Sequence, residues 1–158
     1  MPEPSFFTFT ATGAEKPKEM EGVEPRTLSH AEYKASLNEH LLRSELPDLY
    51  GVARRVIDAL EQRVGHSSLD IQNIADDLHF SKRTLQRRLR EQGYCFSDLR
   101  DLVRRHHGIR IVLEGRQRVD DICITLDFAD RSSLTLAFKR WTGFSPRAFG
   151  RLYRDYLA

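Results

Sequence analysis

Apolar residues recur every three or four positions through most of this chain, which is the spacing of one face of an α-helix. The stretch 48–64 shows the pattern at Val52, Val56 and Leu60. Strand-like alternation is limited to the short segment 8–10. The predicted fold class is therefore all-α. The same period predicts further helices over residues 70–79, 82–92, 97–114, 118–126 and 130–143, and from 146 onwards.

Residues 1–28 differ from the rest of the chain. They are rich in Pro, Gly, Glu and Thr, and Pro17 and Pro25 interrupt any helical period. Such a composition predicts a mobile segment. An aromatic cluster at Phe6, Phe7 and Phe9 could dock this segment on the rest of the chain.

An extra amphipathic helix is predicted over residues 29–47, ending at the proline. Ser29 and Glu32 have the spacing of a capping box, and Leu37 and Leu41 then share one face. This face either packs on the rest of the chain or pairs with a second copy or another partner. The sequence leaves both interpretations open, so a homodimer through this helix is one of the predicted partners.

Two stretches of the chain repeat each other. The offset is 48 residues at their phenylalanines and 50 at their glycines. Each copy has a short helix, a tight connection and a longer helix, which is the plan of a helix-turn-helix unit. The shared positions are Ile71, Ile74, Ala75, Leu78, Phe80, Leu85, Leu89 and Gly93 in the first unit, and Val119, Ile122, Cys123, Leu126, Phe128, Leu134, Phe138 and Gly143 in the second.

The second helix of the first unit, 82–92, is basic on its outward side. Leu85 and Leu89 turn one face to the core, and Ser81 is placed to cap the helix. The opposite face carries no acidic residue before Glu91, whereas ordinary solvated faces mix both signs of charge. The candidate DNA-contacting residues here are Lys82, Arg83, Thr84, Gln86, Arg87 and Arg90.

The corresponding helix of the second unit, 130–142, has a less charged outer face. Leu134, Phe138 and Trp141 point inward, and short hydroxyl side chains that suit base edges or phosphates point outward. Leu136 lies near the same surface. The candidate DNA-contacting residues on this outer face are Arg131, Ser132, Thr135 and Lys139, with Arg140 beside them.

Residues 97–114 are predicted to form one long linker helix between the units. At 1.5 Å per residue it would measure about 27 Å. Successive major grooves on one face of a duplex lie ~34 Å apart. One chain could therefore present the recognition helices 82–92 and 130–142 to two neighbouring grooves of double-stranded DNA.

The charge distribution agrees with a nucleic-acid partner. Residues 1–49 carry five Lys or Arg against nine Asp or Glu, whereas residues 50–158 carry twenty against fourteen. Eighteen of those twenty basic residues are arginine, whose planar guanidinium fits phosphates and guanine edges.

Other classes of protein are disfavoured. No apolar run is long enough to cross a membrane. Cys95 and Cys123 lack metal-like spacing, which argues against a disulfide scaffold or a Cys-based zinc site and favours the cytoplasm. His106 and His107 diverge by about 100° on a helix and cannot easily chelate one ion, so they are interpreted as surface or packing residues. No phosphate-binding loop or catalytic triad stands out, so neither an enzyme nor a cofactor is predicted.

The stretch 49–156 resembles the C-terminal DNA-binding domain of bacterial AraC/XylS-type transcriptional regulators. The matching pieces are IADDLHFSKRTLQRRLREQG (74–93) and DFADRSSLTLAFKRWTGFSPRAF (127–149), and FKRWTGFSP (138–146) is highly specific for that family. The resemblance covers about two-thirds of the chain. It implies two helix-turn-helix units, binding of promoter DNA and activation through contact with RNA polymerase.

By the family pattern, the second unit departs from its relatives at two positions. Asp127 stands where glycine is common, and Leu136 where arginine or another polar residue is common. Two roles stay open for this unit, base reading and phosphate clamping. The base-reading positions that the resemblance implies are Arg83, Gln86 and Arg87 in the first unit and Arg131, Ser132, Ser133 and Thr135 in the second.

The family usually adds a large N-terminal effector or dimerisation domain, which 49 residues cannot supply. Two explanations stay open, a stand-alone DNA-binding member and a truncated chain whose N-terminal domain is incomplete. The first is favoured, because the chain begins at a methionine. Its divisions would be the mobile segment 1–28, the amphipathic helix 29–47 and the DNA-binding domain 48–158. The alternative function is a protein-interaction regulator of the same fold that binds RNA polymerase or another regulator.

Overall fold

The computed structural model describes residues 28–157, and the predictions made for residues 1–27 lie outside this range. The described part is helical throughout and contains no strand, which confirms the all-α prediction. The elements are α1 (His30–Arg43), α2 (Gly51–Arg63), α3 (Ile71–Asp77), α4 (Lys82–Glu91), α5 (Phe96–Glu114), α6 (Val119–Thr125), α7 (Arg131–Thr142), α8 (Pro146–Tyr153) and the 3-10 helix η1 (Arg154–Tyr156).

The predicted repeat is visible in the backbone. Helices α3 and α6 are offset by 48 residues at both ends. After each of them the chain turns through one residue in the left-handed region, His79 (φ 58°) and Asp127 (φ 56°). The next amide then donates back over the turn, from Phe80 to Ala75 and from Phe128 to Cys123, each at 2.9 Å. Two sequences with few identical residues therefore build the same helix-turn-helix connection.

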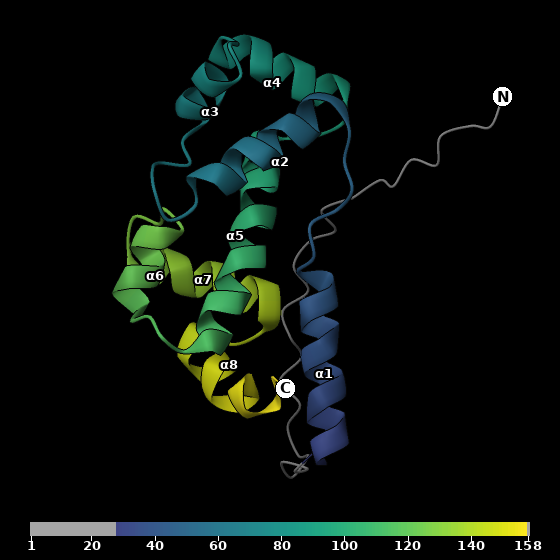
Figure 1. Cartoon of the computed structure of the whole chain (residues 1–158), viewed down its shortest axis with the longest axis vertical. Helices are drawn as coiled ribbons and strands as arrows, with labels where there is room; N and C mark the ends of the chain where they lie inside the picture. Colours follow the sequence, from purple (N-terminus) through teal and green to yellow (C-terminus); the bar gives the residue numbers. More distant parts are fainter. Residues whose placement is uncertain (1–27, 158) are drawn as a thin grey trace, which may run out of the picture.

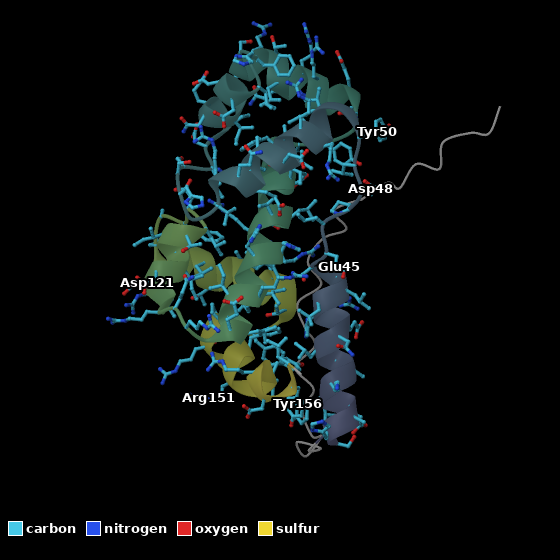
Figure 2. The ribbon with its side chains drawn as sticks, viewed as in Figure 1. Glu45, Asp48, Tyr50, Asp121, Arg151 and Tyr156 are labelled. Carbon is cyan, nitrogen blue, oxygen red and sulfur yellow. The ribbon has the colours of Figure 1, made fainter. Side chains whose placement is uncertain are left out.

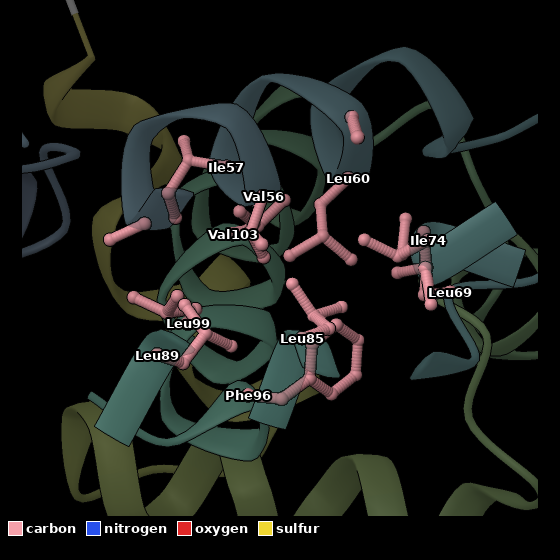
Figure 3. Close-up of a cluster of buried hydrophobic side chains, with 13 residues drawn as sticks. Val56, Ile57, Leu60, Leu69, Ile74, Leu85, Leu89, Phe96, Leu99 and Val103 are labelled. Carbon is pink, nitrogen blue, oxygen red and sulfur yellow. The ribbon is translucent and has the colours of Figure 1, made fainter. Parts of the chain in front are cut away.

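The first unit has its own hydrophobic core, formed by α2, α3, α4 and the first half of α5 (Figure 3). Leu85 and Leu89 enter it from α4 and are fully buried, as predicted. Leu60 meets them from α2, and Leu99 and Val103 from α5. The inward face of α4 is thereby fixed, which leaves its basic face to solvent.

The second core lies at the other end of α5 and also holds α1 (Figure 1). Phe138 of α7 and Phe149 of α8 are fully buried there, with ring centroids 5.4 Å apart. Leu37 of α1 is also buried, and Tyr33 stacks on Tyr156 at 5.2 Å. The apolar face of α1 thus packs on this chain, which is one of the two interpretations that the sequence allows.

The boundaries of α1 follow local hydrogen bonds. The capping box forms as predicted, since Glu32 N donates to Ser29 Oγ at 3.3 Å and Ser29 N donates to Glu32 Oε2 at 2.7 Å. The helix nevertheless ends at Arg43, so the predicted end at Pro47 is wrong. Buried Ser44 closes it, because its hydroxyl donates to the Leu41 carbonyl at 2.8 Å.

The start of α2 is also later than predicted. It begins at Gly51, because Gln92 from the end of α4 reaches across as a cap. The Gln92 side chain accepts from Ala53 N at 2.9 Å and donates to Tyr50 O at 3.0 Å. A contact between residues so far apart in the sequence is invisible to periodicity.

Contacts around Asp127 join the two units. Its carboxylate accepts from the Leu69 amide at 2.8 Å and from the Ser68 hydroxyl at 3.2 Å, both in the loop before α3. Arg104 of α5 donates to the carbonyls of Leu126 and Asp127. Burial lowers the pKa of Arg104 to about 10, which still leaves it charged at neutral pH. These bonds set the relative orientation of the units.

We expect Asp127→Gly to lower the free energy of unfolding by about 1–3 kcal/mol, because the Leu69 amide loses its acceptor. The matched control is His79→Gly, at the equivalent turn, whose side chain forms no hydrogen bond with any residue in the range 28–157. It should change the free energy of unfolding by less than about 1 kcal/mol, since glycine tolerates the left-handed region. Urea denaturation measures both, and equal effects would show that the carboxylate does not join the units.

Acidification below about pH 6.5 should destabilise the fold. Burial lowers the pKa of His40. The positive charge of Arg43 lowers this pKa further, whereas the negative charge of Glu39 raises it in part. Burial and then Arg110 lower the pKa of His106. A folded-state pKa below the unfolded value means that the stabilisation is complete above about pH 6.5 and is lost as the pH falls through the folded value.

Thermal unfolding at pH 7.5 and pH 5.5 measures this effect as a lower Tm at the acidic pH. His40→Gln should reduce the difference, because its ring packs edge-on against Phe149 and Tyr153 at 5.3 and 5.5 Å. His66→Gln, at an exposed loop position, is the control. A pH dependence that is identical in all three proteins would refute the assignment to His40.

In the part of the chain that the structure describes, no helix has the length and apolar character needed to cross a membrane.

Candidate nucleic-acid interface

Helix α4 is fixed at its N-terminus by Ser81. The Ser81 hydroxyl oxygen accepts from the Thr84 amide at 3.1 Å, and its hydroxyl lies 2.8 Å from Thr84 Oγ1 as the donor. Thr84, one of the candidate DNA-contacting residues, is therefore occupied in the cap and half-buried. It therefore lies at the N-terminal end of α4, beside the exposed basic side of the helix and not on that side.

The outward face of α4 is cationic and open. We call it face 1 and define it as Lys82, Arg83, Gln86, Arg87 and Arg90, all of which are exposed. The structure brings these five candidates together on one side of the helix, as predicted. Among residues 28–157, Arg87 alone of the four cations has an acidic neighbour, with Nε 3.8 Å from Glu91 Oε1. A weak, exposed ion pair of this kind leaves the face positive.

The remaining arginine of α4 does not belong to face 1. The Arg88 guanidinium lies 5.0 Å above the ring of Phe80, and Arg55 of α2 lies 5.5 Å from the same ring. In the second unit Arg104 covers the equivalent Phe128 at 4.2 Å. In both units arginine thus shields the aromatic ring of the turn, a packing role.

Helix α7 is capped by Asp130, whose carboxylate accepts from the Ser133 amide at 2.7 Å. This backbone bond, with a further one from the Ser133 hydroxyl, lowers the pKa of Asp130 below its usual range. The Ser133 amide is therefore used in the cap of α7, as the Thr84 amide is used in the cap of α4. Leu134 and Phe138 are fully buried and turn the opposite side of α7 outward.

Two of the predicted cations of α7 are held in ion pairs. Arg131 binds Asp120 of α6 through two nitrogens, which raises the pKa of Arg131 and lowers that of Asp120. Arg140 Nη2 donates to Asp101 of α5 at 2.6 Å, and the same carboxylate accepts from Trp141 Nε1 at 3.0 Å. These arginines tie α7 to α6 and to α5.

What remains open on α7 is a short mixed stripe. We call it face 2 and define it as Ser132, Thr135, Leu136 and Lys139, which follow the i, i+3, i+4, i+7 pattern of one helix side. Thr135 is half-buried and the other three are exposed. Within residues 28–157 Lys139 has no acidic partner, so it supplies the positive charge of this face. Face 2 is thus far less cationic than face 1.

A second basic surface was missed by the sequence analysis. A cavity of about 340 Å³ between α6 and α8 has Arg118, Arg147, Arg151 and Arg154 in its lining. Arg154 donates to the Val112 carbonyl at 3.1 Å and is partly occupied. Figure 2 shows Arg151 extending outward from α8, away from α1. The arginines come from both sides of α7 in the sequence, so only the fold brings them together.

His106 and His107 lie closer together than predicted. His106 donates from Nδ1 to the Ser44 carbonyl at 3.0 Å, and His107 Nε2 lies 3.0 Å from Glu61 Oε1. Potential ligand atoms of Glu61 and both histidines lie within 4.8 Å of one another, so the expectation that the rings diverge too far to share an ion is wrong. In the structure their hydrogen bonds join α5 to α1 and α2.

Two helix-turn-helix units with outward faces on α4 and α7, carried at the two ends of α5, define a DNA-binding regulator of the double helix-turn-helix class. A family model described as a helix-turn-helix domain matches residues 74–152. The chain belongs to the AraC/XylS-type transcriptional regulators.

Curated relatives support this membership. The chain is 29% identical over 126 residues to the HTH-type transcriptional regulator VirS of Mycobacterium tuberculosis, covering 78% of this chain and 37% of VirS. It is 31% identical over 96 residues to the ornithine utilization regulator of Pseudomonas aeruginosa, covering 61% of this chain and 28% of that protein. The chain thus spans about a third of the length of the curated relatives it matches.

Solved structures share the fold. A DNA-binding transcriptional dual regulator from Escherichia coli K-12 superposes with a TM-score of 0.60 at 16% identity, over 70% of this chain and 99% of that one. The transcriptional regulator CdpR from Pseudomonas aeruginosa superposes with a TM-score of 0.58 at 26% identity, over 80% of this chain and 41% of CdpR. The first of these likenesses concerns the fold alone.

Proposed function

We propose that this protein regulates transcription by placing α4 and α7 in successive major grooves of promoter DNA. The observation that carries the proposal is face 1, a cluster of four cations and one glutamine with a single weak acidic neighbour among residues 28–157. Helix α5 has 19 residues, about 28 Å at 1.5 Å per residue, and separates the two units. That length suits two readers about one duplex turn apart.

The proposed contacts divide by chemistry. Arg83 and Arg87 can pair with guanine and Gln86 with adenine, while Lys82 and Arg90 neutralise phosphates. On face 2 the hydroxyls of Ser132 and Thr135 reach base edges or phosphates, and Lys139 reaches a phosphate. Arg131 and Arg140 would contact phosphates only by exchanging their aspartate partners.

One copy of the chain is proposed to occupy one asymmetric site. Both readers belong to the same chain, and the apolar side of α1 is packed against α8 and η1. A homodimer through that side of α1 would first have to release Leu37 from the core. Family membership supports RNA polymerase as the second partner, bound through a surface that DNA leaves free.

The test is selection of bound duplexes from a random library with the full chain. The expected result is one asymmetric site with two boxes whose centres lie about 10 base pairs apart. A palindrome would refute the single-copy arrangement. Absence of any enriched sequence would refute sequence-specific binding and favour the protein-interaction alternative, which also predicts little DNA binding at any salt concentration.

A further inference from the structure

Leu136 is a large apolar residue in the middle of a polar reading face. Its surface is 68% exposed, although every other aliphatic side chain of α7 is buried. Ser132 and Thr135 lie on its N-terminal side and Lys139 on its C-terminal side. The core of the second unit is complete without it, so packing gives no reason for leucine at this position.

The ion pairs of α7 decide which bases this face can read. Guanine is read best by a guanidinium that forks onto O6 and N7. Both arginines of α7 are turned away to Asp120 and Asp101, and face 2 itself has no arginine. Ser132 and Thr135 can hydrogen-bond to several bases and discriminate weakly.

The major groove offers one apolar group, the C5 methyl of thymine. A leucine side chain gains free energy by burying this methyl, whereas against guanine it would leave O6 and N7 without donors. We infer that Leu136 is a specificity-determining residue that packs on a thymine methyl in the box bound by α7. The inference rests on the proposed function and deepens it. It predicts that the box bound by α7 contains thymine, whereas the box bound by α4 contains guanine.

Deoxyuridine, which differs from thymidine only by that methyl, provides the test. Each thymine of the α7 box in the selected duplex is replaced singly by deoxyuridine, and Kd is measured by fluorescence anisotropy. At one position the wild-type protein should bind about 3- to 5-fold more weakly, the effect of losing one buried methyl group. Leu136→Ala should bind the thymine and deoxyuridine duplexes equally well.

Ile124→Ala is the matched control, because Ile124 is an aliphatic side chain that is 78% exposed on α6, outside face 2. It should keep the wild-type response to deoxyuridine. Leu136→Arg tests the same contact by gain of function, since repeated selection should replace thymine by guanine at that one position.

The inference is overturned if wild-type protein binds all deoxyuridine duplexes as tightly as the parent duplex. It is also overturned if Leu136→Ala keeps the deoxyuridine response, because the methyl then acts through another residue or through DNA shape. Failure of the proposed function gives a different result, because the wild-type protein would then select no sequence in either box. That result would overturn the proposed function and the inference together.

Discussion

Replacing Phe138 by alanine is expected to lower the free energy of unfolding by about 3–5 kcal/mol. Its side chain is fully buried, with ring centroids 5.8 Å from Trp141 and 5.4 Å from Phe149. It therefore joins the recognition helix of the second unit to α8. Removing the ring leaves a cavity between elements that other contacts hold apart, and such cavities are strongly destabilising.

Guanidinium denaturation of three variants measures this effect. Lys139→Ala, at the next and exposed position of α7, should change the free energy of unfolding by less than about 0.5 kcal/mol. Phe138→Leu keeps most of the volume and should lie between them, within about 1.5 kcal/mol of wild type. If Phe138→Ala were as stable as Lys139→Ala, the inward and outward faces of α7 would have to be exchanged.

The second large effect is expected for the double variant Arg83→Ala, Arg87→Ala. Each guanidinium lies on face 1, and each proposed base contact is worth about 1–3 kcal/mol. The two positions are neighbours on one helix side, so their effects need not add. We expect a loss of about 2–4 kcal/mol on the selected duplex, which is roughly a 30- to 1,000-fold increase in Kd.

A charge-matched control separates base reading from general attraction. Arg54→Ala with Arg116→Ala removes the same charge from exposed positions outside face 1. Kd for the selected and a scrambled duplex is measured for both double variants across a salt series. The face 1 variant should lose most of its preference for the selected duplex, and the control variant should keep it. Equal losses on both duplexes would assign Arg83 and Arg87 to phosphates instead.

The parts of the fold that depend on neighbours in the sequence were predictable. Leu85 and Leu89 lie four residues apart, so they define the buried side of α4 and with it the whole of face 1. The capping box of Ser29 and Glu32 spans three residues and marks the start of α1. The repeat predicted the second unit, because two stretches with the same spacing of apolar positions are expected to form the same helix-turn-helix core.

The parts that depend on distant residues could not be predicted. From the sequence, Arg131 is predicted to be a free cation, because Asp120 lies on another helix and only the fold brings the two together. Arg140 likewise finds Asp101, a partner 39 residues away. Periodicity assigns each side chain to a face but says nothing about the charge that the facing helix contributes. The second reader therefore turned out less basic than its composition suggested.

Hydrogen bonds of Ser44 connect the C-terminal end of α1 to α5, the helix that separates the two units. The Ser44 carbonyl is held by His106 and the Ser44 hydroxyl accepts from Arg110 at 3.1 Å, both on α5. Helix α1 is therefore joined to α5 by hydrogen bonds as well as packed in the second core through Leu37. The N-terminal helix thus belongs to the framework that positions α7, although it carries none of the residues of face 1 or face 2.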